Sequence, residues 1–211
     1  MKPLPRAATY PGMTTNTPTH LIFRPDVMDF LLSRRSRPAK TLTAPAPDRS
    51  ALLPILTAAA RTPDHGKLEP WRFIVLEGAA LARLAYQTMQ RGRDRGEPEE
   101  KLAKAVASFA DAPLIVAVVA KTVESEKVPP IEQHLSAGAV CLALVNAALA
   151  SGWGANWLTG WMATDAVWLK EGLTLSPDDF VAGFIHIGTE TTPPPDRPRP
   201  DLDAIVDWIA E

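Results

Sequence analysis

The stretch that organises the chain is Ala58-Ala-Ala-Arg-Thr-Pro-Asp-His-Gly-Lys-Leu-Glu-Pro-Trp-Arg-Phe-Ile-Val-Leu76. It begins as the end of an apolar helix and breaks at Pro63, after which a polar turn follows. Pro70 and Trp71 then lead into a run of strand-forming residues. A helix that turns and continues as a buried strand places the polar groups of the turn at the edge of the core, where ligands commonly bind. The stretch therefore predicts a strand with a binding site beside it.

The totals of the chain fit one globular domain. Its 211 residues suffice for a proper core, and 46% hydrophobic and 22% charged residues are ordinary values. The net charge of −2 gives no bulk electrostatic reason to expect nucleic acid or an anionic membrane as a partner. The single cysteine, Cys141, excludes an internal disulfide framework and suits a cytoplasmic protein. We find no secretory signal, and the apolar run 135–150 predicts a buried core helix rather than a membrane span.

Proline marks both ends of the chain. Of the 21 prolines, five lie in residues 1–25 and five in residues 193–200, which predicts extended segments there. We expect residues 1–24 to form a weakly ordered N-terminal arm. Residues 25–211 are expected to form a single domain that ends in a proline-rich tail and a helix. That last helix would carry Leu202, Ile205, Val206 and Ile209 on one face.

Helices and strands alternate between the two ends. The expected helices are 26–33, one containing 52–56, 79–89, 98–110, 132–151 and 165–172, and the expected strands are 73–76, 114–120 and 180–187. The β-branched run 114–120 predicts a central strand buried on both faces, and 26–33 predicts a deeply buried helix. Residues 91–101 predict an exposed, mobile break. The alternation predicts a three-layer α/β sandwich or an α+β domain.

Several kinds of site find no support in the residues. The histidines at 20, 65, 134 and 186 are far apart and lack metal-ligand spacing, so we expect no metal. Cys141 lies in an apolar run without a charged neighbour to lower its pKa, which indicates a packed core thiol. Gly152-Trp-Gly154 follows a helix, whereas a dinucleotide-binding loop follows a strand.

The run Arg34-Arg-Ser-Arg37 allows two interpretations. It is either a solvated basic end of a helix or an anion site, because guanidinium groups and a hydroxyl match phosphate oxygens. What the residues allow overall is a ligand held by arginines, polar loop groups and aromatic planes. A flavin fits this description, with its phosphate for the arginines, its ribityl hydroxyls for the polar groups and its ring for apolar surfaces.

From about residue 28 to residue 188 the chain resembles the nitroreductase family of flavoproteins, in seven segments that come in order. These segments are Arg34-Arg-Ser36; Arg61 with Pro63-Asp-His65; Pro70-Trp-Arg-Phe73; Ala112-Pro-Leu-Ile115 to Lys121; Lys127-Val-Pro129, Glu132 and Ser136-Ala-Gly138; Ala150 through Gly160; and Gly183 to Thr189. The likeness is to a short bacterial subgroup of FMN-dependent NAD(P)H nitroreductase-like proteins. It implies an α+β, three-layer α/β/α fold with a central mixed β-sheet flanked by helices. It also implies a homodimer with a long apolar interface helix.

The resemblance also implies the site. The cofactor-binding residues would be Arg34, Arg35, Ser36, Arg61, His65, Trp157, Leu158 and Thr159, and the NAD(P)-binding residues Ala147, Ala148, Leu149, Ala150, Ser151 and Gly152. The first three would hold the FMN phosphate, and no side chain would be catalytic because the chemistry belongs to the flavin. Two positions depart from the family pattern. Leu158-Thr159 replaces a more polar pair, and Glu69 stands where Gln or Asn is common.

The implied activity is a ping-pong transfer of hydride from NAD(P)H, through bound FMN, to a small acceptor such as a nitroaromatic or a quinone. Alternatives are another reaction on the same flavin scaffold (dehalogenation, enone reduction or flavin breakdown) and a non-catalytic flavin-binding protein. Three roles stay open. His65 is a flavin contact or a turn residue, and Trp157 walls the flavin or fills the core. Arg197 and Arg199 reach a partner subunit's phosphate or belong to a solvated tail.

Overall fold

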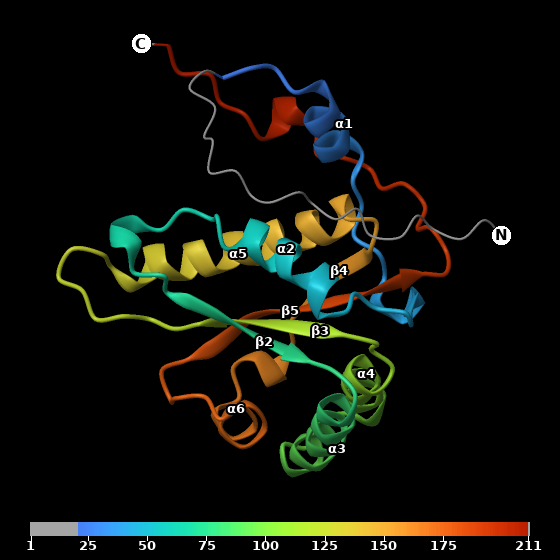
Figure 1. The fold of residues 1–211 in the computed structure, drawn as a ribbon. Coiled ribbons are helices and arrows are strands. Elements are labelled where there is room, and N and C mark those ends of the chain that lie inside the picture. Colours follow the sequence, from blue (N-terminus) through green and yellow to red (C-terminus); the bar gives the residue numbers. More distant parts are fainter. Residues whose placement is uncertain (1–20, 211) are drawn as a thin grey trace.

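The computed structural model describes residues 21–210, so the predicted arm at 1–24 lies almost wholly outside the described residues. A five-stranded sheet lies between two layers of helices (Figure 1). One layer consists of α2 (Arg49–Ala59) and α5 (Pro130–Ala150), and the other of α3 (Ala79–Asp94), α4 (Glu99–Ala110) and α6 (Ala166–Leu173). The predicted three-layer α+β fold is confirmed.

The sheet is antiparallel at every described pairing, so the predicted mixed sheet is wrong. Its strands are β1 (Leu42–Thr43), β2 (Trp71–Leu76), β3 (Ile115–Ala120), β4 (Gly154–Leu158) and β5 (Phe180–Glu190). Their order is β1-β5-β3-β2, and β4 also pairs with β5. Between β2 and β3 the chain makes a hairpin of two helices, α3 and α4, which returns it to the end of the sheet that it left. A single crossover helix would have made these two strands parallel.

The central strand β3 divides the core into two clusters. Leu114, Val116 and Val118 pack toward α2 and α5, whereas Ile115, Ala117 and Val119 pack toward α3, α4 and α6. Their side chains are at most 1% exposed, so the predicted strand with two buried faces is confirmed. By length and composition alone α5 could cross a membrane. Its residues 140, 141, 144 and 145 are instead buried against the sheet, as predicted for a core helix.

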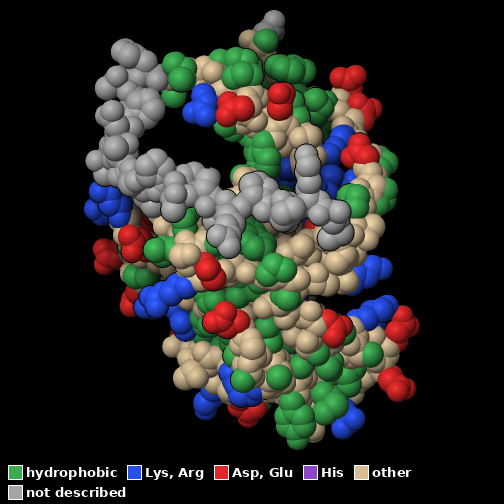
Figure 2. Space-filling view, turned by 45° about the vertical axis from the view of Figure 1, so that its right-hand side comes forward, with side chains coloured by type: hydrophobic (Ala, Val, Ile, Leu, Met, Phe, Trp, Pro, Cys, Tyr) green, Lys and Arg blue, Asp and Glu red, His purple; other side chains and the backbone are tan. Residues whose placement is uncertain are grey.

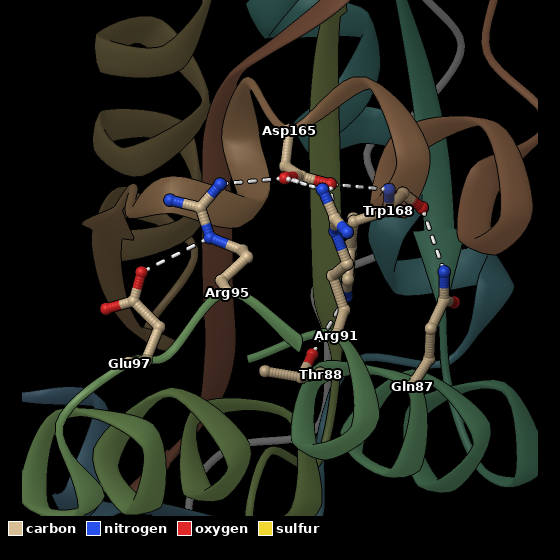
Figure 3. A network of polar contacts seen from close by, with 7 residues as sticks. All are labelled: Gln87, Thr88, Arg91, Arg95, Glu97, Asp165 and Trp168. Carbon is tan, nitrogen blue, oxygen red and sulfur yellow. Dashed lines mark hydrogen bonds and ion pairs between the residues drawn. The ribbon is translucent and has the colours of Figure 1, made fainter. Parts of the chain in front are cut away.

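A polar network joins α3 to the start of α6 (Figure 3). The Asp165 carboxylate accepts from Arg91 Nε and Nη2, each at 3.0 Å, and from Arg95 Nη1 at 2.8 Å. It also caps α6 by accepting the Trp168 backbone N–H at 2.8 Å. The predicted break at 91–101 is therefore shorter than expected, because α3 continues to Asp94 and α4 begins at Glu99.

Two predictions about the ends of the domain are wrong. Helix α1 (Pro25–Ser33) forms, but none of its residues is buried. Residues 202–209 do not form the predicted helix, and only a 3-10 turn, η4 (Leu202–Ala204), is present. In Figure 1 both segments lie beyond the layer of α2 and α5, away from the sheet. Apolar spacing predicts which face of a helix needs cover, whereas it does not say which part of the chain supplies the cover.

Candidate cofactor site

The arginine segment that follows α1 is held on β4. The backbone N–H of Arg37 donates to Ala155 O at 2.8 Å, and Arg37 Nε forms an ion pair with Glu190 Oε1 at 3.2 Å. Just before it, Arg34 Nη2 donates to Ser36 Oγ at 3.1 Å. The three residues predicted to hold a phosphate are therefore anchored next to the first residues of β4.

Arg34 is surrounded by more positive than negative side chains. Burial lowers the pKa of its guanidinium, and the nearby Arg199, Arg35 and Arg37 lower that pKa further. Its Nε is buried and has no hydrogen-bond partner among the described residues. Among the described residues, counter-charge comes from Glu190, which pairs with Arg37, and from Asp196, which pairs with Arg35 and Arg199. Four guanidinium groups thus face two carboxylates, an arrangement that an anion with several oxygens would satisfy.

The proline-rich tail completes this arginine cluster, which we define as Arg34, Arg35, Arg37 and Arg199. Arg35 Nη1 donates to Pro195 O at 2.8 Å and lies 3.5 Å from Asp196 Oδ1. The tail therefore contacts the cluster of its own chain at Pro195 and Asp196, while most of its residues stay exposed. Figure 2 shows Lys and Arg side chains in the recess below α1, under exposed hydrophobic side chains.

A second group of predicted residues lies on the loop 61–69, near the N-terminal end of α5. Ser136 Oγ donates to Pro63 O at 3.0 Å and accepts from Trp71 Nε1 at 3.2 Å. The second of these bonds anchors Trp71 to α5. His65 Nδ1 lies 2.8 Å from Glu132 Oε2 on the first turn of α5. Arg61, the remaining predicted residue of this loop, is exposed.

The loop 61–69 is also strained. Three of its residues have positive φ: Gly66 at 78°, Lys67 at 55° and Glu69 at 47°. For a residue other than glycine, such a conformation costs of order 1–3 kcal/mol and persists only where surrounding contacts enforce it. One of these contacts is the Asp64 carboxylate, which accepts the Glu69 backbone N–H at 2.9 Å. The side chain of Glu69 itself is exposed.

The third group, Trp157 to Thr159, ends β4. Trp157 Nε1 donates to Ala182 O at 3.1 Å, and its ring covers Gly183 and reaches Gly138 of α5. At 37% exposure the ring both packs on the protein and offers a free face. Cys141 Sγ lies beneath it against Gly183, where burial raises the pKa of the thiol to about 12. The prediction of an inert core thiol agrees with this position.

The fourth group lies at the C-terminal end of α5. The side chain of Ala148 is fully buried, whereas Ala150, Ser151 and Gly152 are exposed. Gly152 follows the last turn of the helix with φ of 82°, a left-handed conformation that glycine adopts without strain. Of the predicted stretch 147–152, the buried Ala148 side chain cannot touch a nucleotide in this chain.

Helix α5 separates these groups. His65 contacts Glu132, the third residue of α5. Arg37 lies at the other end of the helix, because its Cγ would be 3.5 Å from a Cβ on Gly154, just after the last turn of α5. A helix of 21 residues spans about 30 Å. Within one chain the structure therefore brings the arginine cluster to the C-terminal end of α5 and the 61–69 loop to its N-terminal end. Our prediction did not assign Glu132 to the site, and it left Arg199 open between a contact to a partner subunit's phosphate and a solvated tail. An acidic residue in the first turn of α5 is a weak signal that could have suggested Glu132.

The comparisons with known proteins agree with this architecture. A model described as "Nitroreductase family" matches residues 31–189. A relative from Escherichia coli K12, named "Putative NAD(P)H nitroreductase YdjA", is 37% identical over 164 residues, which cover 78% of this chain and 88% of the relative.

Two solved structures show the same fold. The nitroreductase-like family protein from Bacillus cereus matches with a TM-score of 0.73 and 21% identity, over 90% of this chain and 99% of that protein. A protein from Desulfovibrio desulfuricans, described as a "putative nitroreductase in complex with fmn", matches with a TM-score of 0.67 and 22% identity. That match covers 88% of this chain and 98% of the other.

Proposed function

Because the chain belongs to the nitroreductase family, we propose that it is an FMN-dependent oxidoreductase that uses NAD(P)H to reduce a small acceptor such as a nitroaromatic or a quinone. The observation that carries this proposal is the buried Arg34 Nε without a partner, in a cluster of arginines that exceeds its counter-charge. Bound FMN would supply the redox chemistry, which connects hydride from NAD(P)H to the reduction of the acceptor.

The arginine cluster holds the FMN phosphate. Arg34 supplies its free Nε, and Ser36, which already accepts from Arg34, supplies a hydroxyl that can donate to a phosphate oxygen. Arg35 is tied to the tail by Pro195 and the exposed Asp196, and a phosphate can replace the weak 3.5 Å contact to that carboxylate. The residues present thus fit a phosphate dianion in charge and in donor number.

The other predicted residues surround the ring and the ribityl chain. Trp157 offers an exposed aromatic face beside Leu158 and Thr159, while Arg61 and His65 offer polar groups from the strained loop. These side chains orient the cofactor and limit access of water to it. No described residue has to act as an acid or a base for the hydride steps, which agrees with the inert Cys141 thiol.

The active form in this proposal is a homodimer. The arginine cluster and His65 lie at opposite ends of α5, farther apart than one FMN molecule reaches, so the two groups meet on one flavin only if they come from two chains. The surface between them is apolar. On α5 the exposed residues Ile131, Leu135 and Leu142 form a stripe, and α1 exposes Val27, Met28, Leu31 and Leu32. Large obligate interfaces have this composition. We place the dimer in the cytoplasm.

The proposal is tested by FMN titration of Arg34→Ala and Arg35→Ala. A lost charge-assisted hydrogen bond weakens binding by about 10- to 100-fold, so we expect the FMN dissociation constant to rise by that factor in each variant. The matched control is Arg93→Ala, which removes an exposed arginine of α3. Circular dichroism should show an unchanged fold in all three. Retention of wild-type FMN affinity by both Arg34→Ala and Arg35→Ala would refute the phosphate assignment.

A further inference from the structure

The contact between His65 and Glu132 has no evident role in stability. Both side chains are largely in solvent, with 59% and 46% of their surfaces exposed, and exposed ion pairs contribute little to folding. The loop already has other anchors, since Ser136 binds Pro63 and Asp64 closes the loop on Glu69. The contact instead constrains where the imidazole of His65 points.

The geometry also selects a tautomer of His65. An ionised carboxylate can only accept hydrogen bonds, so the Nδ1 atom that lies 2.8 Å from Glu132 Oε2 carries the hydrogen. In the neutral imidazole Nε2 is then the acceptor. A free neutral histidine in water prefers the opposite tautomer, with the hydrogen on Nε2. The carboxylate therefore imposes a state that the side chain would not adopt by itself.

One face of α5 holds both anchors. Glu132 and Ser136 are four residues apart, which places them one above the other on the helix surface. Through Glu132 the rigid helix fixes the imidazole, and through Ser136 it fixes the backbone just before it. The positive φ values at positions 66, 67 and 69 show that surrounding contacts enforce the conformation of the loop just after these two anchors.

We propose that Glu132 is a positioning residue, which holds His65 as the Nδ1–H tautomer so that Nε2 accepts a hydrogen bond from an O–H or N–H group of the flavin. This inference rests on the proposed function, because it takes His65 as a flavin contact. To that function it adds Glu132, which touches no ligand, and it defines which nitrogen of His65 carries the hydrogen. A ribityl hydroxyl and the ring N3–H are the flavin donors of this kind.

The first readout is the tautomer, and it needs no flavin. In ¹⁵N spectra of histidine-labelled protein without FMN, at about pH 9 where histidine is neutral, the His65 signals should show a protonated Nδ1 in the wild type. The His65→Ala spectrum assigns these signals among the four histidines. In Glu132→Ala the Nε2–H form should dominate, and in Glu132→Gln, whose amide oxygen can accept, Nδ1–H should persist. A wild-type His65 protonated at Nε2 would overturn the inference.

The second readout is FMN affinity in a double-mutant cycle. Loss of one oriented hydrogen bond corresponds to about a fivefold rise in the dissociation constant, which we expect for His65→Ala and for Glu132→Ala. Glu132→Gln should restore most of the affinity, and Glu132→Ala should add nothing when His65 is already Ala. Glu126→Ala, which removes an exposed glutamate of the preceding loop, serves as the control and should bind FMN like the wild type.

These experiments distinguish a failure of the positioning role of Glu132 from a failure of the proposed FMN-dependent function. If His65→Ala weakens FMN binding and Glu132→Ala does not, the positioning role of Glu132 is wrong while the flavin contact stands. If His65→Ala keeps wild-type affinity, the inference fails and FMN binding by the arginine cluster still stands. If the wild-type protein does not bind FMN, the proposed function itself fails.

Discussion

The backbone N–H of Arg37 donates to the carbonyl oxygen of Ala155 across 2.8 Å. This bond attaches the segment of the arginine cluster to the strand that, two residues later, presents Trp157. The attachment is close, because a Cβ on Gly154 would lie 2.5 Å from Leu42 Cδ2 and 3.5 Å from Arg37 Cγ. The proposed phosphate site and one proposed wall of the flavin site are thus positioned by the same strand.

We predict that Gly183→Ala moves Trp157 and weakens FMN binding. A Cβ at position 183 would overlap Trp157 Nε1 and would lie 2.9 Å from Cys141 Sγ. Since Trp157 is 37% exposed, its ring can swing outward, whereas the buried Cys141 Sγ must also shift, so we expect a loss of about 1–3 kcal/mol in stability. Tryptophan fluorescence should change and FMN affinity should fall several-fold, in a protein that melts a few degrees lower but stays folded. Wild-type FMN affinity in a folded Gly183→Ala protein would show that Trp157 does not contact the flavin.

We predict that Leu135→Glu separates the dimer. Leu135 is 66% exposed on α5, and a charge at the centre of an apolar interface costs several kcal/mol. Analytical ultracentrifugation should find a dimer for the wild type and a monomer with weakened FMN binding for the variant. Tyr86→Glu changes a similarly exposed residue of α3, on the other side of the sheet, and should stay dimeric. If the Leu135→Glu protein is still a dimer, α5 does not form the interface.

We predict that Asp165→Asn lowers the free energy of unfolding by about 2 kcal/mol at pH 7. Hydrogen bonds from Arg91 are the main reason that the pKa of Asp165 falls to about 2 in the fold, with Arg95 and the Trp168 N–H adding to them. A carboxyl group with a lowered pKa contributes its full stabilisation at pH values above its ordinary pKa. That stabilisation is lost as the pH falls toward 2.

Urea unfolding at a series of pH values checks this prediction. The difference between the wild type and Asp165→Asn should be constant above about pH 4 and should shrink between about pH 4 and pH 2. Asp178→Asn, at an exposed site, should match the wild type throughout. A difference that does not depend on pH in this range would contradict the electrostatic account of Figure 3.

We predict that His186 destabilises the protein in mild acid. It is 3% exposed on β5, and burial lowers its pKa to about 4. Between about pH 6.5 and pH 4 the unfolded chain takes up a proton at this position and the folded chain does not, so stability falls with pH by up to about 3 kcal/mol. In His186→Gln the slope of stability against pH should be smaller in this range. A slope equal to that of the wild type would contradict the prediction.

Local patterns sufficed to predict the core elements. The β-branched run before Lys121 is a strand with two buried faces, and the apolar run after Glu132 is the longest described helix. Gly152 and Asp165 were predictable as the end of one helix and the start of another, because caps depend on a few neighbouring residues.

Features that depend on distant residues were not predictable in this way. Arg91 continues a helix because its partner, Asp165, lies 74 residues later in the chain. Strand direction followed from the hairpin of α3 and α4, which the sequence pattern alone did not orient. Helix α1 was expected to be buried, but none of its residues is buried among the described residues, and in the proposed dimer the second chain would cover it. For the site, the resemblance named the residues, while the separation along α5 and the pair of His65 with Glu132 came from the structure.

The visible absorption spectrum of the purified protein tests the central claim most directly. NADPH and then NADH are added to it without oxygen. We predict the absorption bands of bound flavin, and we predict that a reduced nicotinamide nucleotide bleaches them. A colourless protein that also fails to take up added FMN would contradict the account.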